Sequence, residues 1–126
     1  MKELIKKAVE AREKSYSPYS HFKVGAALKT KSGKVYTGTN VESASYGLTV
    51  CAERVAVYKA VSEGERDFEA IAVFTEAEEL TPPCGACRQV LWEFSKDILI
   101  ILANTKGNKE MRLTELLPFP FERRGF

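Results

Sequence analysis

The hydrophobic and polar residues of this chain follow two different repeats, and the changes between them mark the expected helices and strands. Near the N-terminus, the apolar residues recur at helical spacing at Leu4, Ile5, Ala8 and Val9. From Phe22 the pattern changes to the alternation of a strand. The helices expected from this reading cover residues 2–14, 50–63, 84–94 and 114–117. The strands expected from alternation or from continuous apolar runs cover residues 22–29, a segment from 35, and residues 68–75, 97–103 and 109–113.

The order of these elements indicates the fold class. Residues 31–34 form a turn between the first two strands, which predicts a hairpin. The connection over 104–108 is too short for a parallel crossover, so the last two strands should be antiparallel. We therefore expect an α/β fold, a three-layer α/β/α sandwich with a mixed five-stranded sheet. Because 126 residues are too few for two ordinary domains, residues 1–126 should form one domain.

Composition and charge narrow the classes of partner. The chain has 19 basic and 17 acidic residues, a net charge of +2 that is too balanced to indicate a nucleic-acid-binding surface. The first residues mix charges with apolar side chains, and no stretch approaches transmembrane length, so we expect neither a signal peptide nor a membrane partner. An odd number of cysteines, three, is more typical of reduced metal ligands in the cytoplasm than of disulfides.

The three cysteines form a candidate metal site. Cys84 and Cys87 are three residues apart at the start of an expected helix, so their sulfurs can converge on one ion, and Cys51 starts another helix. The positive end of a helix dipole stabilises a thiolate, which is the form that binds metal. Structural zinc has four protein ligands, whereas catalytic zinc has three and leaves one position open. Three ligands therefore indicate catalysis.

Glu53 is the candidate proton carrier, because its carboxylate follows Cys51 by two residues and is not needed as a ligand. Three thiolates around a dication need nearby positive charge, which Arg54, Arg88 or the helix ends could supply. One alternative is a structural zinc site completed by His21, although His21 lacks the short spacing of ligand pairs. A redox Cys-x-x-Cys is another, but it would leave Cys51 and Glu53 without a role.

Four blocks of the sequence, in order, resemble the small cytidine deaminase family. They are residues 17–28, 38–46, 51–54 and 83–90. The Cys-Ala-Glu and Pro-Cys-x-x-Cys elements are also those of zinc nucleobase deaminases in general. The resemblance implies one zinc ion per subunit, bound by Cys51, Cys84 and Cys87, and Glu53 as the proton shuttle from an activated water. It implies hydrolysis of cytidine and deoxycytidine to uridine and deoxyuridine with release of ammonia, as in pyrimidine salvage.

The resemblance also implies the residues that bind substrate. Phe22 would pack on the pyrimidine, Asn40 and Glu42 would hydrogen-bond the sugar, and Ala52 would line the site. In the family, homotetramers share their active sites, and Phe121 matches the aromatic residue that a neighbour contributes. Simpler alternatives remain for each residue. Phe22 could belong to the core, Asn40 and Glu42 could be solvated, and the tail could fold back on its own subunit.

Three other functions compete with a nucleoside deaminase. The first is a deaminase of modified nucleosides, which fits less well with the Phe22, Asn40 and Glu42 set. The second is a polynucleotide-editing deaminase, which has to hold flanking nucleotides and is disfavoured by the antiparallel return of the last strands. The third is a zinc-binding module without activity, which would have no use for Glu53 beside an open metal position.

Overall fold

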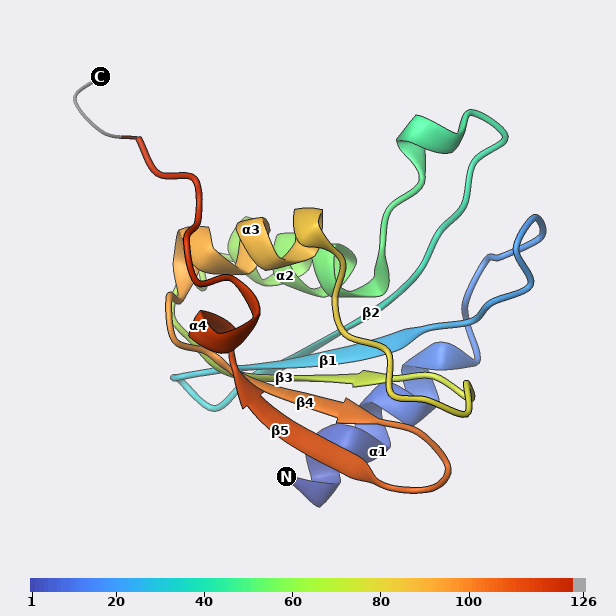
Figure 1. Ribbon diagram of the computed structural model, residues 1–126, viewed down its shortest axis with the longest axis horizontal. Coiled ribbons are helices and arrows are strands. Elements are labelled where there is room, and N and C mark those ends of the chain that lie inside the picture. The colour runs from blue at the N-terminus through green and yellow to red at the C-terminus, as the bar shows by residue number, and fades with distance from the viewer. Residues whose placement is uncertain (124–126) are drawn as a thin grey trace.

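The computed structural model describes residues 1–123 of the chain and has one mixed sheet with helices on both faces (Figure 1). The helices are α1 (Lys2–Arg12), α2 (Ala52–Ser62), α3 (Gly85–Phe94) and α4 (Leu113–Leu116), with a 3₁₀ turn, η1, at Tyr46–Leu48. The strands are β1 (Gly25–Thr30), β2 (Val35–Thr39), β3 (Phe68–Phe74), β4 (Leu99–Ala103) and β5 (Asn108–Arg112). They lie in the order β2-β1-β3-β4-β5.

The strand directions confirm the mixed sheet. β1 is antiparallel to both β2 and β3, whereas β3 and β4 are parallel. The parallel pair needs a long crossover, and α3 provides it. β4 and β5 are antiparallel, as the short connection between them predicted. No helix among the described residues is both long enough and apolar enough to cross a membrane.

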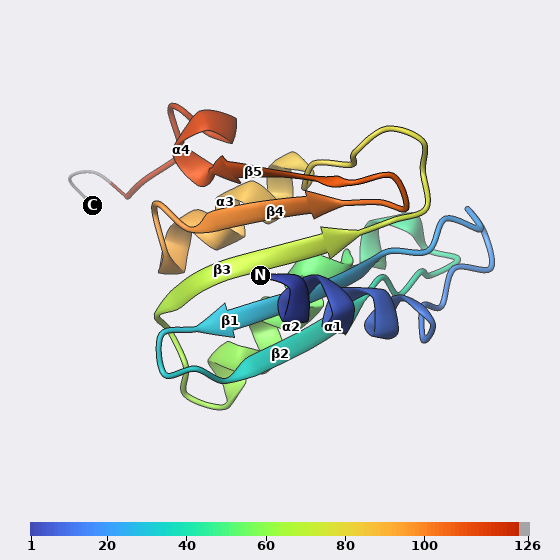
Figure 2. The same ribbon diagram turned by 90° about the horizontal axis from the view of Figure 1, so that it is seen from below.

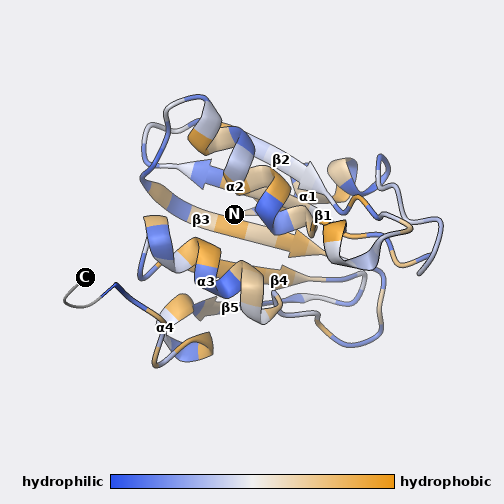
Figure 3. Ribbon diagram, turned by 90° about the horizontal axis from the view of Figure 1, so that it is seen from above, coloured by the Kyte–Doolittle hydropathy of each residue, from blue (hydrophilic) through white to orange (hydrophobic). Residues whose placement is uncertain are grey.

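Two apolar cores hold the three layers together. Figure 2 shows α1 on one face of the sheet, where Leu4 and Ala8 pack against a group that includes Ala72 and Ile101. α2 and α3 cover the other face, and Figure 3 shows the apolar strands β3 and β4 beneath them. The central strands are therefore buried on both sides, which explains their nearly continuous apolar sequence. The predicted three-layer α/β/α architecture is confirmed.

Two glycines allow the helices to lie against the sheet. A Cβ atom on Gly38 of β2 would lie 2.3 Å from the carbonyl oxygen of Ala52 and 2.6 Å from the backbone nitrogen of Ala56. A Cβ atom on Gly25 of β1 would lie 2.0 Å from the carbonyl oxygen of Ala8. Neither position can accept a side chain unless backbone moves. The Gly38 contact places the first turn of α2 against the sheet.

Some predicted boundaries were wrong. The first strand begins at Gly25 and not at Phe22, because the Asn40 side chain takes the backbone hydrogen bonds of the preceding segment. β1 is also buried on both faces at Ala26, Ala27 and Leu28, and not on the one face that alternation predicted. The first helix ends at Arg12, and η1 was not expected. The other predicted helices and strands are present with slightly different ends.

Candidate metal centre and substrate cavity

The three cysteines lie together at the starts of two helices. Cys51 is the N-cap of α2, Cys84 is the N-cap of α3, and Cys87 lies in the first turn of α3. Their sulfur atoms are all within 4.8 Å of one another, with 3.8 Å between Cys51 and Cys84 and 3.5 Å between Cys84 and Cys87. Zinc–sulfur bonds of about 2.3 Å in a tetrahedron put sulfurs about 3.8 Å apart. The donor set therefore fits zinc.

The backbone around these cysteines explains how they meet. Val50, just before Cys51, exchanges backbone hydrogen bonds with Val41. Before α3, the Arg88 guanidinium donates to the carbonyl oxygen of Pro83 at 2.7 Å and to that of Leu116 at 2.8 Å. Each helix start is thus fixed by a contact from another segment. His21 is not part of the cysteine group in residues 1–123, and it lies on an exposed loop.

Arg54 is the arginine beside the sulfurs. Its Nη2 lies 3.6 Å from the Sγ atom of Cys51, whereas Arg88 is directed to backbone carbonyls. Hydrogen bonding from Cys87, helped by Arg54 and Cys84, lowers the pKa of Cys51 to about 5. The contact with Cys51, together with burial, raises the pKa of Cys87. The two shifts favour the thiolate at Cys51 and the thiol at Cys87, and metal binding requires the thiol to lose its proton.

Glu53 is buried close to this cluster. It lies in the first turn of α2, and its side chain is only 5% exposed. Burial raises the pKa of its carboxyl group to about 7, and the negative charge of Cys51 contributes in the same direction. A carboxyl group with such a pKa can accept and release a proton near neutral pH. This property, beside a group of metal ligands, is typical of an acid–base residue.

A cavity of about 240 Å³ joins Glu53 to the other predicted residues. Its walls include Cys51, Ala52, Glu53 and Cys84 on the helix side. The predicted residues Phe22, Asn40 and Glu42 also line it. Sequence reasoning missed the remaining wall residues, which are Ser20, Val24, Thr49, Val73, Thr81 and Pro82. Several of these adjoin residues that were predicted, but Val73 comes from the C-terminal end of β3, and the sequence gives no sign of its place here.

Phe22, Asn40 and Glu42 form one hydrogen-bonded wall. Phe22 is 41% exposed and belongs to neither core, so the alternative of a core residue is wrong. The Asn40 side chain donates to the carbonyl oxygen of Phe22 at 2.7 Å and accepts from the backbone N–H of Val24 at 3.0 Å. Glu42 accepts from the N–H groups of Tyr19 and Ser20. Hydrogen bonding from the Ser20 hydroxyl lowers the pKa of the Glu42 carboxyl group.

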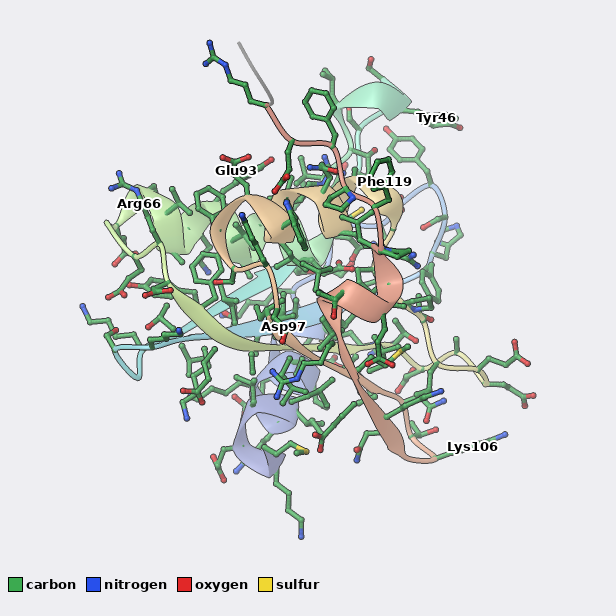
Figure 4. All side chains as sticks on the ribbon, turned by 60° about the vertical axis from the view of Figure 1, so that its left-hand side comes forward. Tyr46, Arg66, Glu93, Asp97, Lys106 and Phe119 are labelled. Atoms are coloured by element: carbon green, nitrogen blue, oxygen red, sulfur yellow. The ribbon has the colours of Figure 1, made fainter. Side chains whose placement is uncertain are left out.

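The structure does not bring Phe121 into this cavity. Its ring is 71% exposed and lies beside α3, where Gln89 accepts from the N–H of Phe121 at 3.1 Å and donates to its carbonyl oxygen at 2.8 Å. The tail backbone therefore does dock on its own subunit, although its rings remain exposed. Figure 4 shows Phe119 and Tyr46 at the outer surface, with 82% and 77% of each residue exposed.

Comparisons with known proteins agree with this geometry. A family model described as "Cytidine and deoxycytidylate deaminase zinc-binding region" matches residues 1–103. Cytidine deaminase from Halalkalibacterium halodurans is 54% identical over 120 residues, which are 94% of this chain and 91% of the relative. Cytidine deaminase from Sporosarcina psychrophila is 46% identical over 125 residues, 98% of this chain and 92% of the relative.

A solved structure extends the agreement to three dimensions. The crystal structure of cytidine deaminase from Burkholderia pseudomallei superimposes with a TM-score of 0.92 at 49% sequence identity. The match covers 95% of this chain and 98% of that one. Such coverage includes the sheet, both helix layers and the segments that carry the cysteines. The chain therefore belongs to the cytidine deaminase family of zinc-type hydrolases.

Proposed function

We propose that this protein hydrolyses cytidine and deoxycytidine to uridine and deoxyuridine with release of ammonia, a reaction of pyrimidine salvage. The observation that carries the proposal is the buried carboxyl group of Glu53 in the same cavity as Cys51 and Cys84. The walls of that cavity also include an aromatic residue, Phe22, and the hydrogen-bonding side chains of Asn40 and Glu42. A nucleoside base could thus lie toward the cysteines and its sugar toward Asn40 and Glu42.

The cysteines would hold one zinc ion per chain, with Arg54 offsetting part of the thiolate charge. When bound, the ion would lower the pKa of a water molecule and so supply the nucleophile. Glu53 would take a proton from this water and transfer it to the ring nitrogen N3 of cytosine. The remaining hydroxyl group would add to C4. Glu53 would then take the second proton, from the hydroxyl group on C4, and deliver it to the exocyclic nitrogen, so that the bond from C4 to nitrogen breaks, a C4 carbonyl forms and ammonia leaves.

The charge of the cavity favours nucleosides over nucleotides. Its described wall residues include the carboxylates of Glu42 and Glu53 and contain no lysine or arginine. A phosphate group on the sugar would face Glu42 without a cation to balance it, and like charges at close range are unfavourable. A described cavity wall without lysine or arginine likewise supports a small molecule, and not a polynucleotide, as the substrate.

Assembly and compartment are part of the same proposal. We propose a homotetramer in which Phe121 of one subunit contributes to the active site of a neighbour. Support comes from the exposed aromatic rings of Tyr46, Phe119 and Phe121, which are costly to leave in water. Metal binding requires reduced thiols at all three cysteines, which supports the cytoplasm as the compartment.

An ammonia-release assay on the zinc-loaded protein tests the reaction. Cytidine, deoxycytidine, deoxycytidylate, free cytosine, adenosine and a short single-stranded DNA would be compared under the same conditions. We expect turnover of the two nucleosides, much weaker turnover of deoxycytidylate, and none of adenosine or DNA. Preferred turnover of the nucleotide or of the DNA would contradict the proposal, and so would full activity after zinc has been removed and shown to be absent.

A further inference from the structure

Ser20 is the hydrogen-bonding centre of the loop that forms one wall of the cavity. Its hydroxyl group donates to Oε2 of Glu42 and accepts from the backbone N–H of Phe22 at 3.0 Å. Its own backbone N–H donates to Oε1 of Glu42 at 3.1 Å. A single small side chain therefore connects the carboxylate at the expected sugar end of the cavity with the aromatic residue at the expected base end.

The backbone of Phe22 is consequently held at both its N–H group and its carbonyl oxygen. Ser20 binds its N–H group, and the Asn40 side chain binds its carbonyl oxygen at 2.7 Å. Between Ser20 and Phe22, His21 has a φ of 59°, a left-handed conformation that is uncommon for a residue other than glycine. It lies within a local turn in which the backbone N–H of Phe22 donates to the hydroxyl oxygen of Ser20, two residues earlier. The loop thus has a defined shape although it contains no regular secondary structure.

The same contacts determine how much of Glu42 is available to a ligand. A carboxylate has about four acceptor sites on its two oxygens. Tyr19 and Ser20 occupy Oε1 through their N–H groups, whereas the Ser20 hydroxyl occupies one site on Oε2. Oε2 therefore keeps capacity for one more donor, and Glu42 is a wall residue of the cavity. The direction of that oxygen depends on Ser20.

We propose that Ser20 is a positioning residue for nucleoside binding, because it fixes Oε2 of Glu42 and the backbone of Phe22 together. This inference rests on the proposed function and extends it to a residue outside the metal centre. Ser20 acts before the reaction, by pre-forming the surface that receives sugar and base, and its hydroxyl proton is donated to Glu42 and not to the reacting atoms. Its removal should therefore weaken substrate binding and leave the chemical step nearly unchanged.

The test is Ser20→Ala in the zinc-loaded full chain, assayed with cytidine. Loss of a hydrogen bond to a charged group leads us to expect KM to rise by roughly tenfold or more, with kcat within about threefold of wild type. Zinc content should be unchanged. Ser62→Ala is the matched control, because Ser62 is an exposed residue in the last turn of α2, outside the cavity, and its hydroxyl donates to the carbonyl oxygen of Lys59.

A second pair of variants separates the hydroxyl group from its size. Thr and Val have nearly the same shape, and Ser20 is exposed, so either side chain has room. Ser20→Thr keeps the donor and should restore a KM close to wild type, whereas Ser20→Val should behave like Ser20→Ala. If the Thr and Val variants have the same KM, or if Ser20→Ala lowers kcat as strongly as it raises KM, the positioning role is wrong. This pair also decides the matter if the alanine variant does not fold.

A measurement without substrate distinguishes this inference from the proposed function. Amide hydrogen exchange at Phe22 should become faster in Ser20→Ala and Ser20→Val than in wild type or Ser20→Thr, because the N–H loses its acceptor. Unchanged exchange at Phe22 would overturn the inference. If wild-type protein has no cytidine deaminase activity while exchange changes as expected, it is the proposed function that has failed.

Discussion

At the scale of single residues, the site combines the three cysteines with one buried acidic residue, Glu53. Cys51 is ionised beside Arg54, and Glu53 follows on the same helix turn with a pKa of about 7. Burial raises the pKa of the Glu53 carboxyl group, and the negative charge of the neighbouring thiolate contributes in the same direction. Near neutral pH, Glu53 can therefore both take a proton as a carboxylate and give one up as an acid, which is what the proposed reaction requires.

Replacing Glu53 with glutamine tests this role directly. The amide has the shape of the carboxylate and cannot accept a proton from water, so Glu53→Gln should fold and bind zinc. Turnover of cytidine should fall by roughly two to four orders of magnitude. Steady-state kinetics together with metal analysis would measure both quantities. A variant with zinc bound and nearly full turnover would show that another group transfers the proton.

Arg54 gives a second prediction at this scale. Arg54→Met removes the positive charge 3.6 Å from Cys51 and should weaken zinc binding by roughly ten- to a hundredfold, as is usual for groups that contact metal ligands. Competition with a chromophoric chelator would measure the affinity. Arg66→Met is the control, since it removes the same charge from an exposed position. Equal affinities for the two variants would mean that Arg54 does not stabilise the thiolates.

The sequence was sufficient for the residues that carry chemistry and for part of the cavity wall, but not for the rest of that wall. Three cysteines and a glutamate at fixed spacing have few uses other than a metal centre, so the prediction that they lie together held. Ser20 lines the cavity because of the path of its loop, and Val73 lines it because of the packing of β3. Tertiary contacts determine both positions, and no local pattern reports them.

At the scale of helices and strands, the starts of α2 and α3 determine the geometry of the site. The periodicity of the sequence predicted these helices, but it could not show that the segment before β1 is bound by Asn40 and not by a neighbouring strand. An alternating pattern describes side-chain burial and contains no information about backbone partners. This is why the predicted strand began at Phe22 and the observed one begins at Gly25.

Gly38 provides the prediction for this scale. In Gly38→Ala the new methyl group would lie 2.3 Å from the carbonyl oxygen of Ala52, so α2 would have to move from β2. We expect a loss of roughly 1–3 kcal/mol in the free energy of unfolding, as for other overpacked sites. Chemical denaturation would measure it. Gly107→Ala is the control because a Cβ atom there meets nothing within 4 Å, and similar stabilities for the two variants would contradict the close approach.

At the scale of the whole molecule, the position of the tail keeps Phe121 apart from the other residues of the proposed site. The backbone of Phe121 is held on α3 by Gln89, and Phe121 is exposed and not among the described wall residues of the cavity of its own chain. A chain with Phe121 in this position cannot use it for its own substrate. A neighbouring subunit could, and that arrangement would also cover the exposed aromatic surface.

Subunit mixing tests the shared site. Glu53→Gln and Phe121→Ala chains should each form nearly inactive assemblies, because one lacks the proton carrier and the other the aromatic wall. If each site takes Glu53 from one chain and Phe121 from another, an equal mixture that exchanges subunits should have both residues intact in roughly a quarter of its sites. Cytidine turnover after mixing, with light scattering to measure the oligomer, would show the recovery. A fully active monomer, or exchanged subunits with no recovered activity, would mean that each chain completes its own site.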